Sequence, residues 1–139
     1  MPVAWTPPPE IPVACFVRAA DRYSLPRVLL PAIIKVENRQ KNPGAVRVNT
    51  NGTRDYGYFQ HNSLLLSEYS SKFGIAVDAF KKDQCLAVMA TAYKIRYEIN
   101  RYGGDFWRGV GAYHSRTPSL NRRYAEKVYY AAQNISWAQ

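Results

Sequence analysis

An almost continuous apolar run, Leu29 to Val36, ends at a single acidic residue, Glu37. Leu30, Ile34 and Glu37 fall on one stripe of a helix, and Ile33 lies four residues before Glu37 on the same side. This stripe is expected to be buried and to draw the carboxyl group of Glu37 out of water.

Burial disfavours the charged form of a carboxyl group and raises its pKa. An acid that is still protonated near neutral pH is what the cleavage of an acetal bond requires. Glu37 is therefore the first candidate for a catalytic acid. The alternative is a partly exposed carboxylate at a helix end, with no chemical role.

Apolar spacing and helix-breaking residues predict a mainly α chain. Asp83 is a suitable N-cap for a long helix, which Gly103 and Gly104 close. Asn51 and Gly52 form a tight-turn dipeptide and predict a small hairpin within an otherwise irregular segment, residues 45–58. Helices are expected over residues 12–23, 25–39, 63–73, 83–102, 105–113 and 118–133.

Pro31 lies inside the second of these helices, for which Ser24 is the expected N-cap. A proline in a helix interior removes one hydrogen bond and clashes with the preceding turn. Either the helix begins later than Ser24 suggests, or it kinks at Pro31.

The length of 139 residues suits one domain with one core, which we place over residues 13–139. Residues 1–12 hold five of the nine prolines and are expected to form an extended tail. They lack the apolar stretch of a secretory signal peptide. No apolar run approaches the roughly 18–20 residues that span a bilayer, so we expect no membrane span.

The formal net charge is +9, and the basic residues are spread along the chain. A nucleic-acid footprint more often concentrates them on one element, and no recognition motif or zinc spacing is present. We therefore expect no nucleic-acid partner. A diffuse positive field suits an anionic polymer such as a bacterial cell wall, and it also serves solubility alone.

Cys15 and Cys85 both lie in segments with helical apolar spacing. If the chain is exported, we expect them to pair and to join the first helix to a central one. In the chain-entropy model, closing a loop of roughly 70 residues is worth about 4 kcal/mol. The alternative is two buried free thiols in a cytosolic protein.

Four short motifs together resemble those of the lytic transglycosylases, lysozyme-like enzymes that cut bacterial peptidoglycan. The resemblance covers about residues 13–132, and the four occur in the order that the family shows. They are Glu37-Asn38, Gly57-Tyr58-Phe59-Gln60, Ala112-Tyr113-His114-Ser115 and Arg123-Tyr124-Ala125. The resemblance implies an all-α, lysozyme-like catalytic domain with no metal and no cofactor.

The resemblance also implies a mechanism. Glu37 would protonate the oxygen of the β-1,4 bond between N-acetylmuramic acid and N-acetylglucosamine, and would then accept the proton of the muramoyl C6 hydroxyl. That hydroxyl would attack the anomeric carbon to give a 1,6-anhydro product, without a second catalytic carboxylate. Asp55 could assist by stabilising positive charge on the sugar ring or by orienting a hydroxyl, or it could be a solvated loop residue or form an Asx-turn.

The other motif residues are implied to contact substrate. Gly57 would let the backbone pass close to the sugar, Phe59 would form a groove wall, and Gln60 would donate a hydrogen bond. Tyr113 and Tyr124 would flank Glu37, although either could be structural.

Three of the four motifs depart from the usual family pattern. Asn38 stands where a serine usually follows the acid. Tyr58-Phe59 replaces Leu-Met in the second motif. His114 replaces an asparagine in the third motif, where it could bind substrate, tune Glu37 when charged, or only complete the pocket wall.

The expected partner is the peptidoglycan glycan strand, and the expected location is the periplasm. The Tyr113-His114-Ser115 form and the acid at Asp55 resemble members that serve secretion, conjugation or pilus systems. Two alternatives stay open: a hydrolysing lysozyme that uses Glu37, and a catalytically silent subunit that binds the wall.

Overall fold

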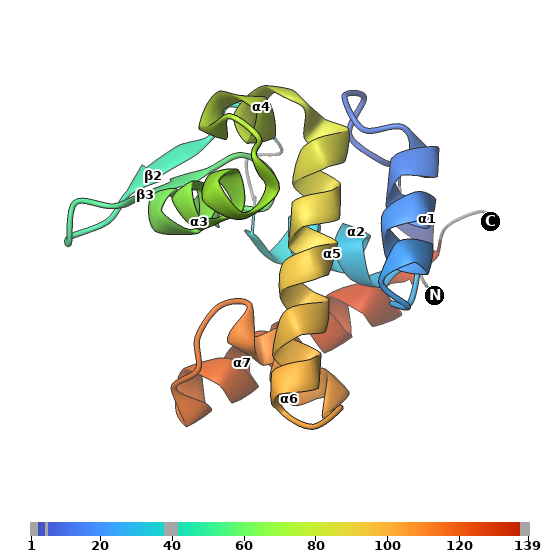
Figure 1. Ribbon diagram of the computed structural model, residues 1–139. Helices are drawn as coiled ribbons and strands as arrows, with labels where there is room; N and C mark the ends of the chain where they lie inside the picture. Colours follow the sequence, from blue (N-terminus) through green and yellow to red (C-terminus); the bar gives the residue numbers. More distant parts are fainter. Residues whose placement is uncertain (1–2, 5, 38–41, 137–139) are drawn as a thin grey trace.

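The computed structural model describes residues 3–4, 6–37 and 42–136, which form seven helices and two small sheets (Figure 1). The mainly α fold class expected from the sequence is confirmed. In chain order the elements are β1 (Val3–Ala4), α1 (Val13–Arg22), α2 (Leu29–Glu37), β2 (Val46–Val48), β3 (Arg54–Tyr56), β4 (His61–Asn62), α3 (Ser63–Phe73), α4 (Val77–Lys82), α5 (Gln84–Arg101), α6 (Phe106–Ala112), α7 (Pro118–Gln133) and β5 (Ile135–Ser136).

The longest helix, α5, passes through the centre of the molecule (Figure 1). It contacts α1, α2, α4 and α6. Its start is the one that the sequence predicts, because the Asp83 side chain accepts a hydrogen bond from the Leu86 backbone N–H at 3.1 Å. The other elements are arranged around this helix.

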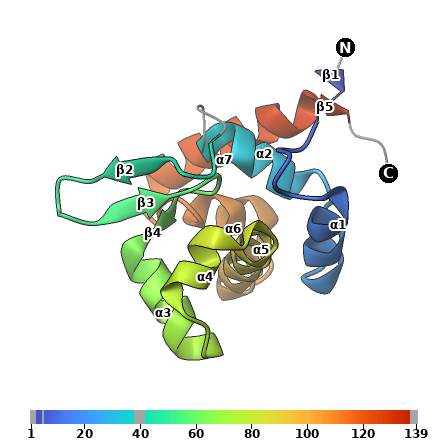
Figure 2. The ribbon, with the colours of Figure 1, turned by 90° about the horizontal axis from the view of Figure 1, so that it is seen from above.

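Two hydrophobic clusters lie along α5. The larger joins α1, α2, α5, α6 and α7 and includes Phe16, Leu30 and Ile33, all fully buried. The smaller contains Leu66, Tyr69 and Phe80 from α3 and α4. The β2–β3 hairpin extends outward on the α3 side, away from α1 (Figure 2).

The hairpin expected around Asn51 and Gly52 is confirmed. β2 and β3 are antiparallel, and Gly52 occupies the turn with a φ of 86°. The register places Arg47 opposite Asp55, and β4 extends the sheet by pairing with β3. This register brings the side chains of Arg47 and Asp55, which lie eight positions apart in sequence, next to each other.

The second helix begins later than Ser24 suggests. α2 starts at Leu29, so Pro31 lies in its first turn, where a missing N–H costs no hydrogen bond. Ser24 is not an N-cap but has a φ of 54°. Of the two expected alternatives, the later start is correct. The expected end of this helix, Arg39, lies outside the described residues.

Close packing sets the position of α6. A Cβ atom at Gly109 would lie 2.5 Å from the backbone of Ile99 in α5, and one at Gly111 would lie 2.5 Å from the backbone of Asn121 in α7. Side chains at either position would therefore force the helices apart. The two glycines fix the point from which Tyr113 and His114 leave α6.

Segments at both chain ends contact the domain. β1 pairs in parallel with β5, Ile11 is 1% exposed, and the Tyr58 hydroxyl donates to the Glu10 carboxylate at 2.6 Å. The proline-rich segment that the sequence predicts as a tail is thus attached at several points. Its separation from the domain at residue 12 stays a prediction.

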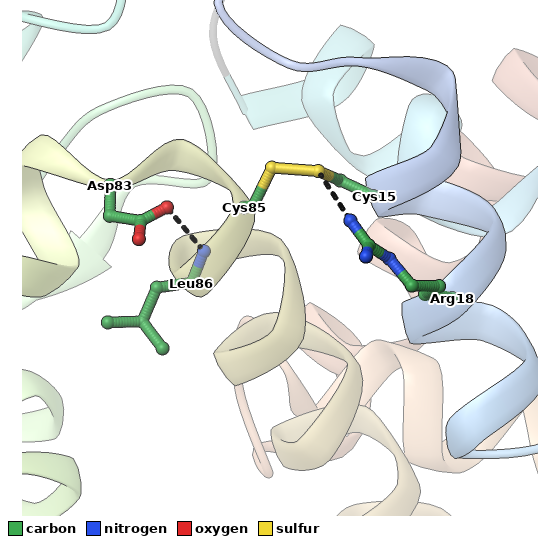
Figure 3. Close-up of a disulfide and its surroundings, with 5 residues drawn as sticks. All are labelled: Cys15, Arg18, Asp83, Cys85 and Leu86. Carbon is green, nitrogen blue, oxygen red and sulfur yellow. Dashed lines mark hydrogen bonds between the residues drawn. A yellow bond between two sulfur atoms is a disulfide. The ribbon is translucent and has the colours of Figure 1, made fainter.

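A disulfide joins Cys15 in α1 to Cys85 in α5 (Figure 3). The pairing expected for an exported chain is therefore present, with the two Cα atoms 5.4 Å apart and the two cysteines 70 positions apart in sequence. Arg18 lies beside it, and its guanidinium donates to the Cys15 sulfur at 3.7 Å. None of the helices in the described ranges has the length and apolar character needed to cross a membrane.

Candidate active site

A groove of about 790 Å³ contains Glu37 and lies between the β2 strand of the hairpin and α7. The end of α2 supplies Val36 and Glu37, and the four consecutive residues 45–48 supply the wall on the hairpin side. The lining on the α7 side consists of Leu120, Arg123, Tyr124 and Lys127. The groove is open to solvent, so an extended polymer can enter it.

Glu37 is the only acid that lines this groove among the described residues. Burial raises its pKa from 4.5 to about 7, against the opposing effects of the Arg47 charge and of the Tyr124 hydroxyl. Ile33 and Ile34, one turn before it, are 0% and 3% exposed, as the apolar stripe predicts. The carboxyl group is therefore partly protonated at neutral pH and can give up a proton inside the groove.

Tyr124 lies beside this acid. Its hydroxyl lies near the Glu37 carboxyl and lowers the pKa of that group, but it makes no hydrogen bond to any of the described residues. The ring of Tyr113 stacks on that of Tyr124, with centroids 6.4 Å apart. The Tyr113 hydroxyl donates to the Phe59 carbonyl oxygen at 3.0 Å, so it ties α6 to the segment after the hairpin.

Asp55 is buried and held by two partners. Its carboxylate forms an ion pair with Arg47 at 2.8 Å and accepts a hydrogen bond from the Asn62 amide at 3.0 Å. It therefore differs from the solvated loop residue that was one alternative. Its negative charge contributes to the raised pKa of Glu37, but its side chain does not line the groove.

The second motif forms the turn between β3 and β4. Gly57 has a φ of 75°, which favours glycine, and its N–H donates to the Ala45 carbonyl oxygen at 2.8 Å. The Gln60 side chain lines the groove, but its amide donates to the Gly57 carbonyl oxygen at 2.8 Å. Phe59 is 1% exposed and belongs to the core rather than to the lining of the Glu37 groove.

His114 lines the groove and stacks on the Tyr124 ring, with centroids 5.0 Å apart. Burial, Arg47 and Lys127 lower its pKa below the usual value, which favours the neutral form of the imidazole. This placement favours a role in the pocket wall over a charged neighbour of Glu37. Asn38, the remaining expected contact, lies outside the described residues.

The sequence alone did not identify Arg47, Leu120 and Lys127 as groove residues. A helical stripe through Tyr124 would have suggested the last two, which lie four residues before it and three after it. A hairpin centred on Asn51 would have placed Arg47 opposite Asp55. Each signal becomes specific only once Glu37 and Tyr124 are known to face the same space.

The described part of the chain gathers no group of three or more His, Cys, Asp and Glu side chains that could hold a metal ion. The arrangement in the groove is one raised-pKa acid with a phenol beside it and cations around it. Such a site can donate a proton to a leaving oxygen and take one back.

Comparisons with known proteins give a family match and several relatives. A family model described as the transglycosylase SLT domain matches residues 14–135. Protein IpgF of Shigella flexneri is 34% identical over 119 residues, which are 83% of this chain and 76% of that protein. Invasion protein IagB of Salmonella typhimurium strain SL1344 is 31% identical over 119 residues, which are 83% of this chain and 72% of that protein.

Proposed function

The chain belongs to the transglycosylase SLT domain family, and on that premise we propose that it cleaves the β-1,4 bond between N-acetylmuramic acid and N-acetylglucosamine in peptidoglycan. The observation that carries the proposal is the placement of Glu37 in the groove at the end of α2, where burial raises its pKa to about 7. An acid with this pKa is about half protonated at neutral pH, where it can act first as acid and then as base.

The proposed reaction has two proton transfers at the same carboxyl group. Glu37 gives its proton to the glycosidic oxygen while the bond from that oxygen to the anomeric carbon breaks. The C6 hydroxyl oxygen of the muramoyl sugar then bonds to the anomeric carbon, and its proton passes to the Glu37 carboxylate. The product is a 1,6-anhydro sugar, no water is consumed, and the acid is restored.

The state of Asp55 supports this route over hydrolysis. Glycosidases with two catalytic carboxylates have both carboxyl groups flanking the scissile bond. Asp55 does not line the groove, and its carboxylate accepts hydrogen bonds from Arg47 and Asn62. We propose that Asp55 holds Arg47 at the groove and influences Glu37 through its charge.

Analysis of the products from purified peptidoglycan tests the proposal. Mass spectrometry should find anhydro ends with the wild type, and Glu37→Gln should lower the rate of their release by at least about a hundredfold, as expected for loss of a general acid. Reducing ends would instead identify a hydrolysing lysozyme. A wild type that binds the wall but never cuts it would identify a silent wall-binding subunit.

We also propose that the enzyme works in the periplasm and serves a secretion, conjugation or pilus system. The disulfide supports an oxidising compartment. One relative is called an invasion protein, which supports the link to such a system. In a strain that lacks the gene, the wild-type gene should restore assembly of the system, whereas Glu37→Gln should not.

A further inference from the structure

The side of α7 that faces the groove carries two cations and no acid. Arg123 and Lys127 are four residues apart, so they lie on one side of the helix about 6 Å apart along its axis. Tyr124, between them, is the residue beside Glu37. The two cations therefore flank the point where a glycan strand would be cleaved.

Both cations are exposed and free to bind a ligand. Neither Arg123 nor Lys127 has a hydrogen bond or ion pair to any residue in the ranges that the structure describes. Arg47, on the opposite wall, is in contrast paired with Asp55 at 2.8 Å. The unneutralised positive charge of the groove is thus concentrated on α7.

The charge on the rest of α7 is mixed. Arg122 and Glu126, each one residue before a groove cation, are exposed but do not line the groove. An ordinary solvated helix surface carries both signs, as these two residues do. The groove side departs from that pattern, which favours binding of an anion over a general role in solubility.

We propose that Arg123 and Lys127 bind carboxylate groups of the glycan strand, so that the groove selects an anionic polymer over a neutral one with the same β-1,4 linkage. This inference rests on the proposed function, and it names the property by which the same site recognises its substrate. The carboxylate has two sources. Strands without stem peptides carry a free lactyl carboxylate on each muramoyl sugar, and strands with stem peptides carry carboxylates on the peptide.

Binding is measured in the Glu37→Gln background, so that no probe is cut. The three probes are a peptide-free tetrasaccharide of alternating N-acetylglucosamine and N-acetylmuramic acid, the same tetrasaccharide with stem peptides, and neutral chitotetraose. Calorimetry at low salt compares this background with and without the added Arg123→Ala/Lys127→Ala change. An exposed ion pair is worth about 0.2–1 kcal/mol, so each lost cation should weaken binding of a charged probe about 1.4- to 5-fold.

A matched control removes the same charge elsewhere. Arg122→Ala/Lys82→Ala also deletes one arginine and one lysine, both exposed and outside the groove lining. It should leave the binding of every probe unchanged, which excludes an effect of net charge alone. The loss in the groove variant should shrink as salt rises, because salt screens exposed charges.

The outcomes separate this inference from the proposed function. A loss confined to the peptide-free probe assigns the carboxylate to the lactyl group, and one confined to the peptide-bearing probe assigns it to the stem peptide; a loss on both supports both sources. An unchanged affinity, or an equal loss with chitotetraose, overturns the inference even if the wild type makes anhydro products. Charge-selective binding without cleavage would overturn the proposed chemistry alone, and binding of no probe would overturn both.

Discussion

Replacing Glu37 with glutamine should stabilise the fold, and the gain should depend on pH. Burial raises the pKa of Glu37 from 4.5, its ordinary value, to about 7. The folded state therefore binds this proton more tightly than the unfolded state does. The stability that the protonated acid provides is fully present below pH 4.5, declines as pH rises, and is lost above about pH 7.

The size of the effect follows from these two pKa values. Each pH unit between them corresponds to 1.36 kcal/mol, so the ionised acid costs the fold about 3 kcal/mol above pH 7. The carboxyl group is partly exposed, and screening by solvent reduces the expected value to about 2–3 kcal/mol. Glutamine has nearly the same shape and no charge, so the variant avoids this cost.

Urea unfolding followed by circular dichroism, at intervals from pH 4 to pH 8, measures the difference between the two proteins. The difference should grow in favour of Glu37→Gln by about 2–3 kcal/mol between pH 4.5 and 7.5. His61, whose pKa is lowered to about 4 by burial, titrates in both proteins and cancels. Glu126→Gln, which removes an exposed acid from α7, controls for the loss of a carboxylate elsewhere.

A difference that stays constant across this range would refute the reasoning. It would mean that Glu37 has the same proton affinity in the folded and unfolded chain. The acid would then be ionised at neutral pH, and the observation on which the proposed function depends would be removed.

Three further predictions concern the surroundings of this acid. Tyr124→Phe removes a donor that lowers the pKa of Glu37, so the pH at which activity falls on the alkaline side should rise by about 0.4–1 unit in a pH–rate profile. Arg116→Ala leaves the fully buried Glu98 carboxylate with only Lys94 as its ion-pair partner among the described residues; urea unfolding should show a loss of about 3 kcal/mol, and a loss under about 1 kcal/mol would contradict it. Reduction of the disulfide between α1 and α5 should lower the free energy of unfolding by about 2–4 kcal/mol. The helical circular dichroism signal should stay near its native value under mild conditions. An unchanged urea midpoint would contradict this prediction.

Local patterns were sufficient to predict most of the helices. The bounds expected for residues 63–73 and 118–133 agree with α3 and α7, and Asp83 caps α5 as its position suggests. These features depend on contacts between residues three or four positions apart, so they can be predicted directly from the sequence. α4 was missed because six residues are too few to show a helical period.

The candidate site was predictable to the extent that it depends on the same local patterns. Glu37 could be singled out because the apolar stripe that buries it lies within two turns of the same helix. Gly57 was singled out through the family resemblance, and the structure shows that its turn needs a positive φ. The burial of Phe59 could not be inferred, because Phe59 lies in the turn between β3 and β4, where no periodic pattern separates buried from exposed side chains.

The sequence by itself determined where the helices run, which acid the chain would shelter, and which cysteines could pair. The family resemblance implied that Tyr124, 87 positions after Glu37, lies beside it, but only the tertiary structure decided that Arg47 is paired with Asp55 and that Arg123 and Lys127 face the open groove. The reason is the range of the forces involved. Helical periodicity is set by neighbours one turn away, whereas the meeting of α2, the hairpin and α7 depends on the packing of the whole core around α5, which no local pattern encodes.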